Sequence, residues 1–200
     1  MNTFSQYGED FKVMEILDRW KIGQGRLLEI GAYDPKALSN SRAFIEDGWE
    51  AVLIEPSPKH IAALAREYHD NPRVTLLAAP VTVHGGIITL ELTDDALSGE
   101  TIPEQWRQAG GYYGRAKFLS ISVQELLNHF GGNFDVISID TEGFSVDLFN
   151  QVLLCGARPR VVIVEHDSRH VELAQIAEAA CYRQVHLNGT NAILEWRSGE

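Results

Sequence analysis

Apolar residues in this chain recur at two spacings, which predict strands and helices in alternation. Short, nearly unbroken apolar runs are typical of buried parallel strands, and we expect them at 26–29, 51–54, 74–79, 134–139 and 161–164. Apolar positions spaced by three or four predict amphipathic helices over 4–20, 42–47, 58–68, 123–130, 145–154 and 168–180. The alternation predicts an α/β fold with five parallel strands.

Local residues predict where several elements begin and how the chain ends. Ser57 precedes a proline at the first helical position, and Ser122 with Glu125 has the spacing of a capping box. The segments 183–187 and 192–196 flank an Asn-Gly turn, which predicts a terminal hairpin. We therefore expect a doubly wound, mostly parallel seven-stranded sheet with a C-terminal antiparallel hairpin, in one domain over 1–200.

The segment 93–117 interrupts this pattern. It contains four glycines, one proline and three aromatic residues, and it shows no clear period. A long irregular segment between strands often carries function, so we expect an excursion that lies over the active site. The rings of Trp106, Tyr112 and Tyr113 either stack on a sugar or form a small core of the segment itself.

Composition and charge limit the class of protein. With 200 residues, 44% hydrophobic and 22% charged, the chain fits one ordinary domain. A net charge of −11 disfavours binding to nucleic acid or to anionic membranes, because both need clustered positive charge. We find neither an apolar run long enough to span a membrane nor a signal peptide, and expect a cytoplasmic protein. Cys155 and Cys181 are expected to be reduced thiols.

Acidic residues at the ends of the first two predicted strands indicate a nucleoside site. The first run ends in Glu29 and turns through Gly31, and the second ends in Glu55. An acid at the end of the second strand can accept both hydroxyls of a ribose. The turn has one glycine where a dinucleotide site needs three, and Asp34 would repel a pyrophosphate. S-adenosylmethionine, which is cationic and has no phosphate, is therefore favoured over NAD.

A second group of acids follows the later strands. Its members are Asp140, Glu142, Glu165, His166 and Asp167. Neighbouring strand ends would bring them to the crevice that holds the cofactor, where clustered carboxylates raise a pKa or bind a cation. Oxygen ligands with one imidazole suit Mg²⁺ or Mn²⁺, so Asp140, Glu165 and His166 are candidate metal ligands. The alternative is that Asp140 only orients the cofactor ammonium or the acceptor hydroxyl.

Histidines are the next candidates for catalysis. His166 is the candidate base, because imidazole titrates near neutral pH; the alternative is that it donates to a backbone carbonyl. His60, His69, His129 and His170 fall in or beside predicted helices and are expected at the surface.

Five short motifs resemble, in order, those of the FkbM-type methyltransferases. They are S-Q-Y-G-E-D at 5–10, E-I-G-A at 29–32 followed by S-N at 39–40, G-W at 48–49, I-E-P at 54–56 and I-D-T-E-G at 139–143. The resemblance covers about 4–165, although the family often has Asp at the position of Glu29 and smaller residues at 33–35. It implies an S-adenosylmethionine-dependent methyltransferase fold.

The resemblance also implies roles for single residues. Gly31 and Ala32 would back the methionine part of the cofactor, Glu55 would hold the ribose, and Gln6 and Asn40 would enclose the amino-acid end. The expected cofactor site is thus Gln6, Glu29, Gly31, Ala32, Tyr33, Asn40, Glu55, Pro56 and Ser57, with Asp140 and His166 as catalytic residues. The methyl group would go to a hydroxyl of a sugar, a glycan or a small natural product.

Two alternatives remain at the level of sequence. One is a cofactor-binding module without catalysis. The other is an NAD-dependent epimerase or reductase, which would need a Tyr-x-x-x-Lys pair; Tyr113 and Lys117 have that spacing, but in a glycine-rich stretch. The expected partner is a small-molecule or carbohydrate acceptor, and the sequence does not predict an oligomeric state.

Overall fold

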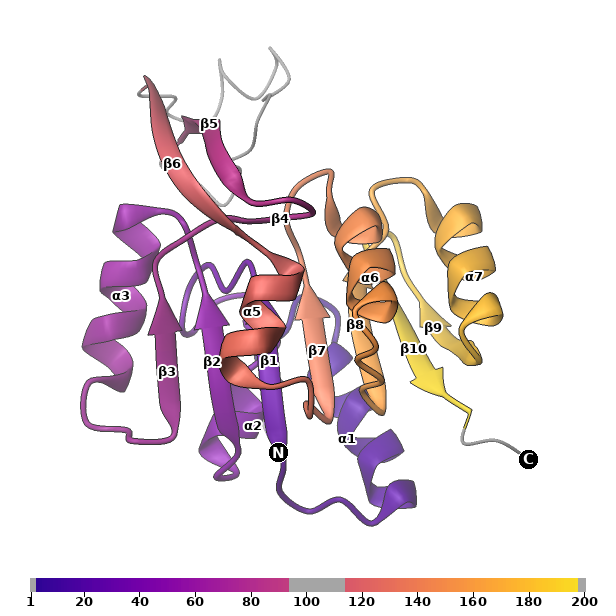
Figure 1. Cartoon of the computed structure of the whole chain (residues 1–200). Helices are drawn as coiled ribbons and strands as arrows, with labels where there is room; N and C mark the ends of the chain where they lie inside the picture. Colours follow the sequence, from indigo (N-terminus) through magenta and orange to yellow (C-terminus); the bar gives the residue numbers. More distant parts are fainter. Residues whose placement is uncertain (1–2, 94–113, 198–200) are drawn as a thin grey trace.

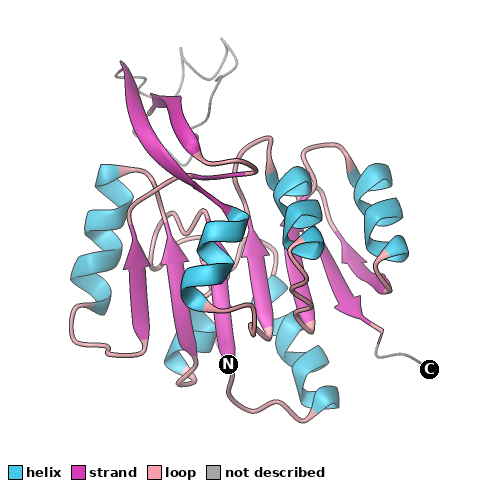
Figure 2. Cartoon of the chain, in the orientation of Figure 1, coloured by secondary structure: helices cyan, strands magenta, loops and turns pink. Residues whose placement is uncertain are grey.

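The computed structural model describes residues 3–93 and 114–197, and its main feature is a seven-stranded sheet with helices on both faces (Figures 1 and 2). The strand order is β3-β2-β1-β7-β8-β10-β9. The strands are β1 Arg26–Ile30, β2 Glu50–Ile54, β3 Val74–Leu77, β7 Val136–Ile139, β8 Val161–Glu165, β9 Tyr182–Leu187 and β10 Asn191–Trp196. The first five are parallel, and β10 is antiparallel to both neighbours. The predicted fold class is confirmed.

Two helical layers bury the two faces of this sheet. One layer is α1 Glu9–Trp20, α2 Arg42–Glu46 and α3 Pro58–Tyr68; the other is α5 Val123–Phe130, α6 Ser145–Leu154 and α7 His170–Ala179. In β8, Val161 and Ile163 pack in the core of the first layer, whereas Val162 and Val164 pack in the core of the second. Burial on both faces explains why the parallel strands are continuous apolar runs.

The residues at element ends agree with most predictions. The capping box of Ser122 and Glu125 is present, with each residue accepting a backbone N–H of the other. Pro58 begins α3, although the Ser57 hydroxyl makes no capping bond. The first helix was expected from residue 4 but begins at Glu9, because Asp10 accepts backbone N–H groups of the preceding loop, including that of Phe4 at 2.8 Å.

A hairpin stands at the carboxyl-end edge of the sheet (Figure 1). It consists of β5 Gly86–Leu92 and β6 Gly114–Ser122, which are antiparallel, and β4 Val81–Thr82 pairs with the end of β6. The predicted excursion over 93–117 was too long, since residues 114–117 are the first part of β6 and pair with residues 89–92. Trp106, Tyr112 and Tyr113 lie outside the described residues.

The strand register brings the candidate site residues to the same edge of the sheet. Ile30, the last residue of β1, pairs with Ile54 of β2 and with Ile139 of β7, so the residues that follow these strands emerge side by side. Glu165 of β8 pairs with Asn191, the first residue of β10. None of the helices in the described ranges has the length and hydrophobicity that a membrane crossing requires.

Candidate active site

A cavity of about 330 Å³ lies beyond the carboxyl ends of the parallel strands. Residues from the ends of β1, β2 and β7 line one side of it, and residues from β4 and β5 line another. Eight of the nine predicted cofactor residues line the cavity: Gln6, Glu29, Gly31, Tyr33, Asn40, Glu55, Pro56 and Ser57. Ala32 does not; it is 3% exposed and packs in the core of the α1 layer.

Glu55 ties together the loops that follow β1 and β2. Its Oε2 accepts the backbone N–H of Tyr33 at 2.9 Å, and its Oε1 accepts that of Ser57 at 2.7 Å. Burial raises the pKa of this carboxyl group, while the two N–H groups oppose the rise. Each carboxylate oxygen has a further lone pair, so a buried diol can still bind to it.

Glu29 lies deeper in the cavity wall. Its Oε1 accepts the backbone N–H of Asn40 at 3.3 Å, whereas Oε2 is buried and has no hydrogen-bond partner among the described residues. Burial, helped by the charges of Asp140 and Glu55, raises the pKa of Glu29 to about 8. A buried carboxyl oxygen without a partner is costly, and it indicates that this wall is built to contact a polar ligand.

At Gly31 the loop that follows β1 lies against the loop that follows β7. A Cβ added to Gly31 would lie 1.7 Å from the backbone oxygen of Asp140, and its φ of +88° is one that side chains disfavour. Tyr33 is also left-handed, with φ of 46°. Asp34 does not line the cavity, because its carboxylate accepts the N–H groups of residues 36 and 37 in its own turn.

His60 is a cavity residue that the sequence did not predict. We expected it at the surface, but it is 5% exposed, lines the cavity and lies 4.4 Å from the ring of Tyr33 between centroids. The surface prediction was wrong because the first turn of α3 faces the ligand side of the sheet. The helical pattern alone could not show this, since it gives the face that packs on the core.

The N-terminal loop reaches the cavity through a link to the C-terminal hairpin. Glu9 Oε1 accepts the side-chain amides of Asn188 at 2.9 Å and Asn191 at 2.8 Å, and Oε2 accepts the N–H of Tyr7 at 2.8 Å. These bonds hold the exposed Gln6 against the cavity. They also fix the amide of Asn191, whose buried oxygen has no partner among the described residues and belongs to the cavity lining.

The sequence could not predict the role of Asn191. Its side-chain amide donates to Glu9, 182 residues away in the sequence, and no local pattern links the two positions.

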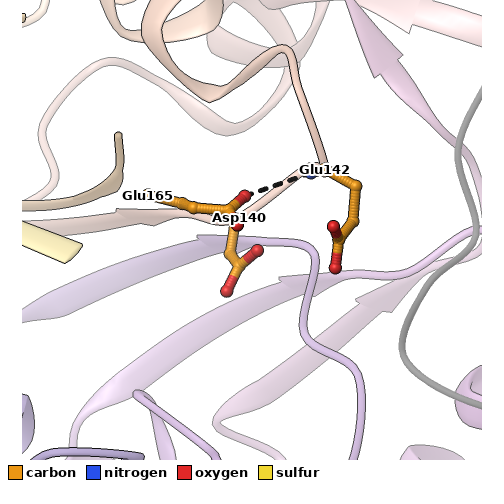
Figure 3. Close-up of side chains that lie close together, drawn as sticks. All are labelled: Asp140, Glu142 and Glu165. Atoms are coloured by element: carbon orange, nitrogen blue, oxygen red, sulfur yellow. Dashed lines mark hydrogen bonds between the residues drawn. The ribbon is translucent and has the colours of Figure 1, made fainter. Parts of the chain in front are cut away.

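Three carboxyl groups cluster on the β7 and β8 side (Figure 3). Each of Asp140, Glu142 and Glu165 has an oxygen within 4.8 Å of those of the other two, and the N–H of Glu142 donates to Glu165 at 3.3 Å. Burial and the neighbouring acids raise the pKa of Glu165 to about 10, and burial also raises that of Asp140. Either a retained proton or a bound cation would relieve the repulsion in this cluster.

His166 is not part of this cluster. It is 8% exposed, its Nδ1 accepts the N–H of Ser168 at 3.2 Å, and its Nε2 lies 3.2 Å from the carbonyl oxygen of Asn188. Both ring nitrogens thus lie within hydrogen-bond distance of backbone groups, which agrees with the alternative of a bond to a backbone carbonyl. The structure therefore does not bring His166 together with Asp140 and Glu165 as the predicted metal set requires, and His166 does not line the cavity.

Much of the remaining wall is apolar, although Thr82, His84 and Thr141 also line the cavity. Val83, Ile88 and Leu90 come from the β4–β5 region, and Phe144 and Leu148 come from the β7–α6 side. No lysine or arginine is among the lining residues in the described part of the chain.

Comparison with known proteins identifies the family of this chain. A model of the methyltransferase FkbM domain matches residues 29–196, whereas a search of curated proteins finds no match. Among solved structures, methyltransferase FkbM from Methylobacillus flagellatus KT has 12% identity and a TM-score of 0.57, over 87% of this chain and 44% of that one. The SAH-bound methyltransferase PaMTH1 of Podospora anserina has 15% identity and a TM-score of 0.54, over 97% and 80%.

A hypothetical protein of Thermus thermophilus is also similar, with 17% identity and a TM-score of 0.54 over 96% of this chain and 87% of that one. At these identities the structural likeness concerns the fold alone, which this chain shares with the two methyltransferases. The family match covers most of the chain and includes the ends of β1, β2, β7 and β8, where the cavity lies. The chain belongs to the FkbM family of S-adenosylmethionine-dependent methyltransferases.

Proposed function

We propose that this protein transfers a methyl group from S-adenosylmethionine to a hydroxyl group of an uncharged acceptor, a sugar, a glycan or a small natural product. The observation that carries the proposal is Glu55, a buried carboxylate held by two backbone N–H groups at the mouth of the loop that contains Gly31. In sheets of this kind, an acid in that position binds the hydroxyls of a ribose.

The residues of the cavity fit this cofactor. The volume of about 330 Å³ is within the range of small-molecule sites. Three cavity residues have buried polar atoms without a partner among the described residues: Glu29 Oε2, Ser57 Oγ and Asn191 Oδ1. Such atoms are rare in folded proteins, and a polar ligand would satisfy them. The absence of lysines and arginines from the described lining suits a cation and disfavours a dinucleotide.

Each protein group would have a definite task. Glu55 would accept the ribose hydroxyls, the backbone of Gly31 would lie against the amino-acid portion, and Gln6 and Asn40 lie where they can enclose it. When bound, S-adenosylmethionine supplies a methyl group on a positively charged sulfur. Because methyl transfer is an in-line displacement, the main task of the cavity is to align the acceptor oxygen with the methyl carbon.

The acceptor hydroxyl also has to lose its proton. Asp140 is the candidate base, because it lines the cavity and its pKa is raised, which improves a carboxylate as a base near neutral pH. We leave His166 out of this role, since both of its ring nitrogens are within bonding distance of backbone groups outside the cavity. We assign no metal to the reaction.

The charge of the cavity lining limits the class of acceptor. Glu29, Glu55, Asp140 and Glu142 all line the cavity, and the described lining contains no side chain with a permanent positive charge. A phosphorylated or carboxylated acceptor would be repelled. The apolar wall of Val83, Ile88, Leu90 and Phe144 suits an acceptor with an apolar face beside its hydroxyl.

Ligand-dependent thermal unfolding tests the cofactor. A ligand at about 100 times its Kd adds roughly 2.7 kcal/mol, which raises the Tm of a domain of this size by about 5–10 °C. We expect this rise with S-adenosylmethionine and with its product S-adenosylhomocysteine, and none with NAD. A rise with NAD alone would overturn the proposal.

Turnover then separates an enzyme from a silent binding module. Formation of S-adenosylhomocysteine should be followed with a panel of neutral glycosides, polyols and hydroxylated natural products, with phosphorylated sugars as the negative set. Binding without turnover of any neutral acceptor would favour the module, whereas turnover confined to phosphorylated acceptors would contradict the charge argument.

A further inference from the structure

Glu29 has features that cofactor binding alone does not explain. The register of β1 and β2 places it one residue before the strand end, its side chain is 3% exposed, and one of its oxygens is without a partner among the described residues. A carboxylate buried in this way would normally be paired with a positive group. An ionised Glu29 would therefore need a positive charge from a ligand, which is present only while that ligand is bound.

The side chains that face Glu29 increase the cost of a negative charge on it. The ionisable ones are Glu55, which follows β2, Asp140, which follows β7, and Tyr68 on α3; the neutral ones are Asn40 and Ser41, between β1 and α2. Glu55 and Asp140 are carboxylic acids, and burial raises the pKa of the Tyr68 phenol, so none of the three offers a positive charge. A full negative charge on Glu29 is thus opposed by burial and by like charges, and its pKa of about 8 leaves it largely protonated at neutral pH.

We propose that Glu29 makes the site distinguish the positively charged methyl donor from its neutral thioether product, by losing its proton to water when the cation binds. The inference rests on the proposed function. No bond other than the carboxyl O–H is broken in this step, and the carboxylate that forms is balanced by the sulfonium. After transfer the positive charge is gone, Glu29 takes a proton back from solvent, and the product binds less tightly.

Calorimetric titration tests the inference. S-adenosylmethionine and S-adenosylhomocysteine should be titrated into the wild type at pH 6.5 and pH 8.5, each in two buffers of different ionisation enthalpy. We expect binding of the charged donor to release about one proton at pH 6.5, and binding of the product, which keeps the ammonium but not the sulfonium, to release fewer. The ratio of the product Kd to the donor Kd should rise about tenfold or more between the two pH values, since linkage allows up to tenfold per pH unit.

Two variants assign the effect to this residue. In Glu29→Gln, which keeps the shape and removes the titration, the ratio should be the same at both pH values. Glu178→Gln removes one exposed acid from α7 and should behave as the wild type. The proton count of the wild type stands even if Glu29→Gln does not fold.

The outcomes separate the two proposals. If both ligands bind and the wild-type ratio does not change with pH, or changes equally in Glu29→Gln, the role of Glu29 is refuted while the methyltransferase proposal stands. If neither ligand binds at either pH, the proposed function fails and the inference fails with it.

Discussion

The substitution Gly31→Ala would place a methyl group against the carbonyl oxygen of Asp140. The added Cβ would lie 1.7 Å from that oxygen and 2.8 Å from its carbon, and both are backbone atoms that no side-chain rotation can move. The β1 and β7 loops would have to separate by more than an ångström. Because Asp140 N donates to Ile30 O at 2.9 Å, the same movement would strain the pairing at the strand ends.

The expected loss has two parts. A side chain at φ of +88° costs about 1–2 kcal/mol, and relieving an overlap in a packed region costs about 1–3 kcal/mol more. The free energy of unfolding should therefore fall by about 2–5 kcal/mol, which lowers the Tm of a domain of this size by about 5–15 °C. Chemical and thermal unfolding of the purified variant would measure this.

Gly156→Ala is a matched control for the backbone part. Gly156 has nearly the same φ, +85°, but a Cβ added there meets nothing within 4 Å. The free energy of unfolding of Gly156→Ala should fall only by the conformational cost, about 1–2 kcal/mol. If Gly31→Ala were no less stable than Gly156→Ala, the close contact between the two loops would be wrong, and with it our explanation of why this position is glycine.

Three further predictions concern acids of the site. Glu55→Gln turns an amide N–H₂ towards a backbone N–H, so the Kd for S-adenosylhomocysteine should rise about tenfold or more by calorimetry; an unchanged Kd would contradict the ribose assignment. Asp140→Asn should lower kcat with an identified acceptor by about 10²–10⁴-fold, whereas His166→Gln should leave it within about threefold; the reverse order would move the base to His166. Glu165 has a raised folded pKa, so its contribution to stability is present below about pH 4.5 and is lost as pH rises towards 10. Glu165→Gln should therefore match the wild type at pH 4.5 and be more stable by about 1 kcal/mol or more at pH 8; equal stability at both pH values would refute the buried-acid interpretation.

Most of the fold could be predicted from the sequence because the patterns that determine it are local. The runs at 51–54 and 161–164 are apolar on both faces, and the capping box at Ser122 closes on a residue three positions away. The register of the parallel strands then required only that their ends align. The start of β6 at Gly114 was missed because its first residues are Gly-Arg-Ala-Lys, and only their partner strand makes them a strand.

The candidate site could be predicted only in part, because many of its contacts join segments that are distant in the sequence. Acids at strand ends are brought together by topology, so Glu55 and Asp140 could be placed at the same crevice from the sequence. The direction of a single side chain depends on contacts that no period encodes. His166 pairs with the carbonyl of Asn188, and Asn191 is fixed by Glu9 at the other end of the chain. Both relations join segments that are neighbours only after folding.

The acids at the strand ends limit what the cavity can bind. Consecutive strands β2, β1, β7 and β8 each place a carboxyl group at or beside the same edge, as Glu55, Glu29, Asp140 and Glu165. Burial or like charge raises the pKa of all four, so their ionised forms lower the stability of the empty fold. A phosphate-bearing cofactor would increase that cost, whereas hydrogen-bond donors such as ribose hydroxyls would lower it. A cation would lower it further by direct attraction of opposite charge, which is why the edge that weakens the fold suits the sulfonium that we propose.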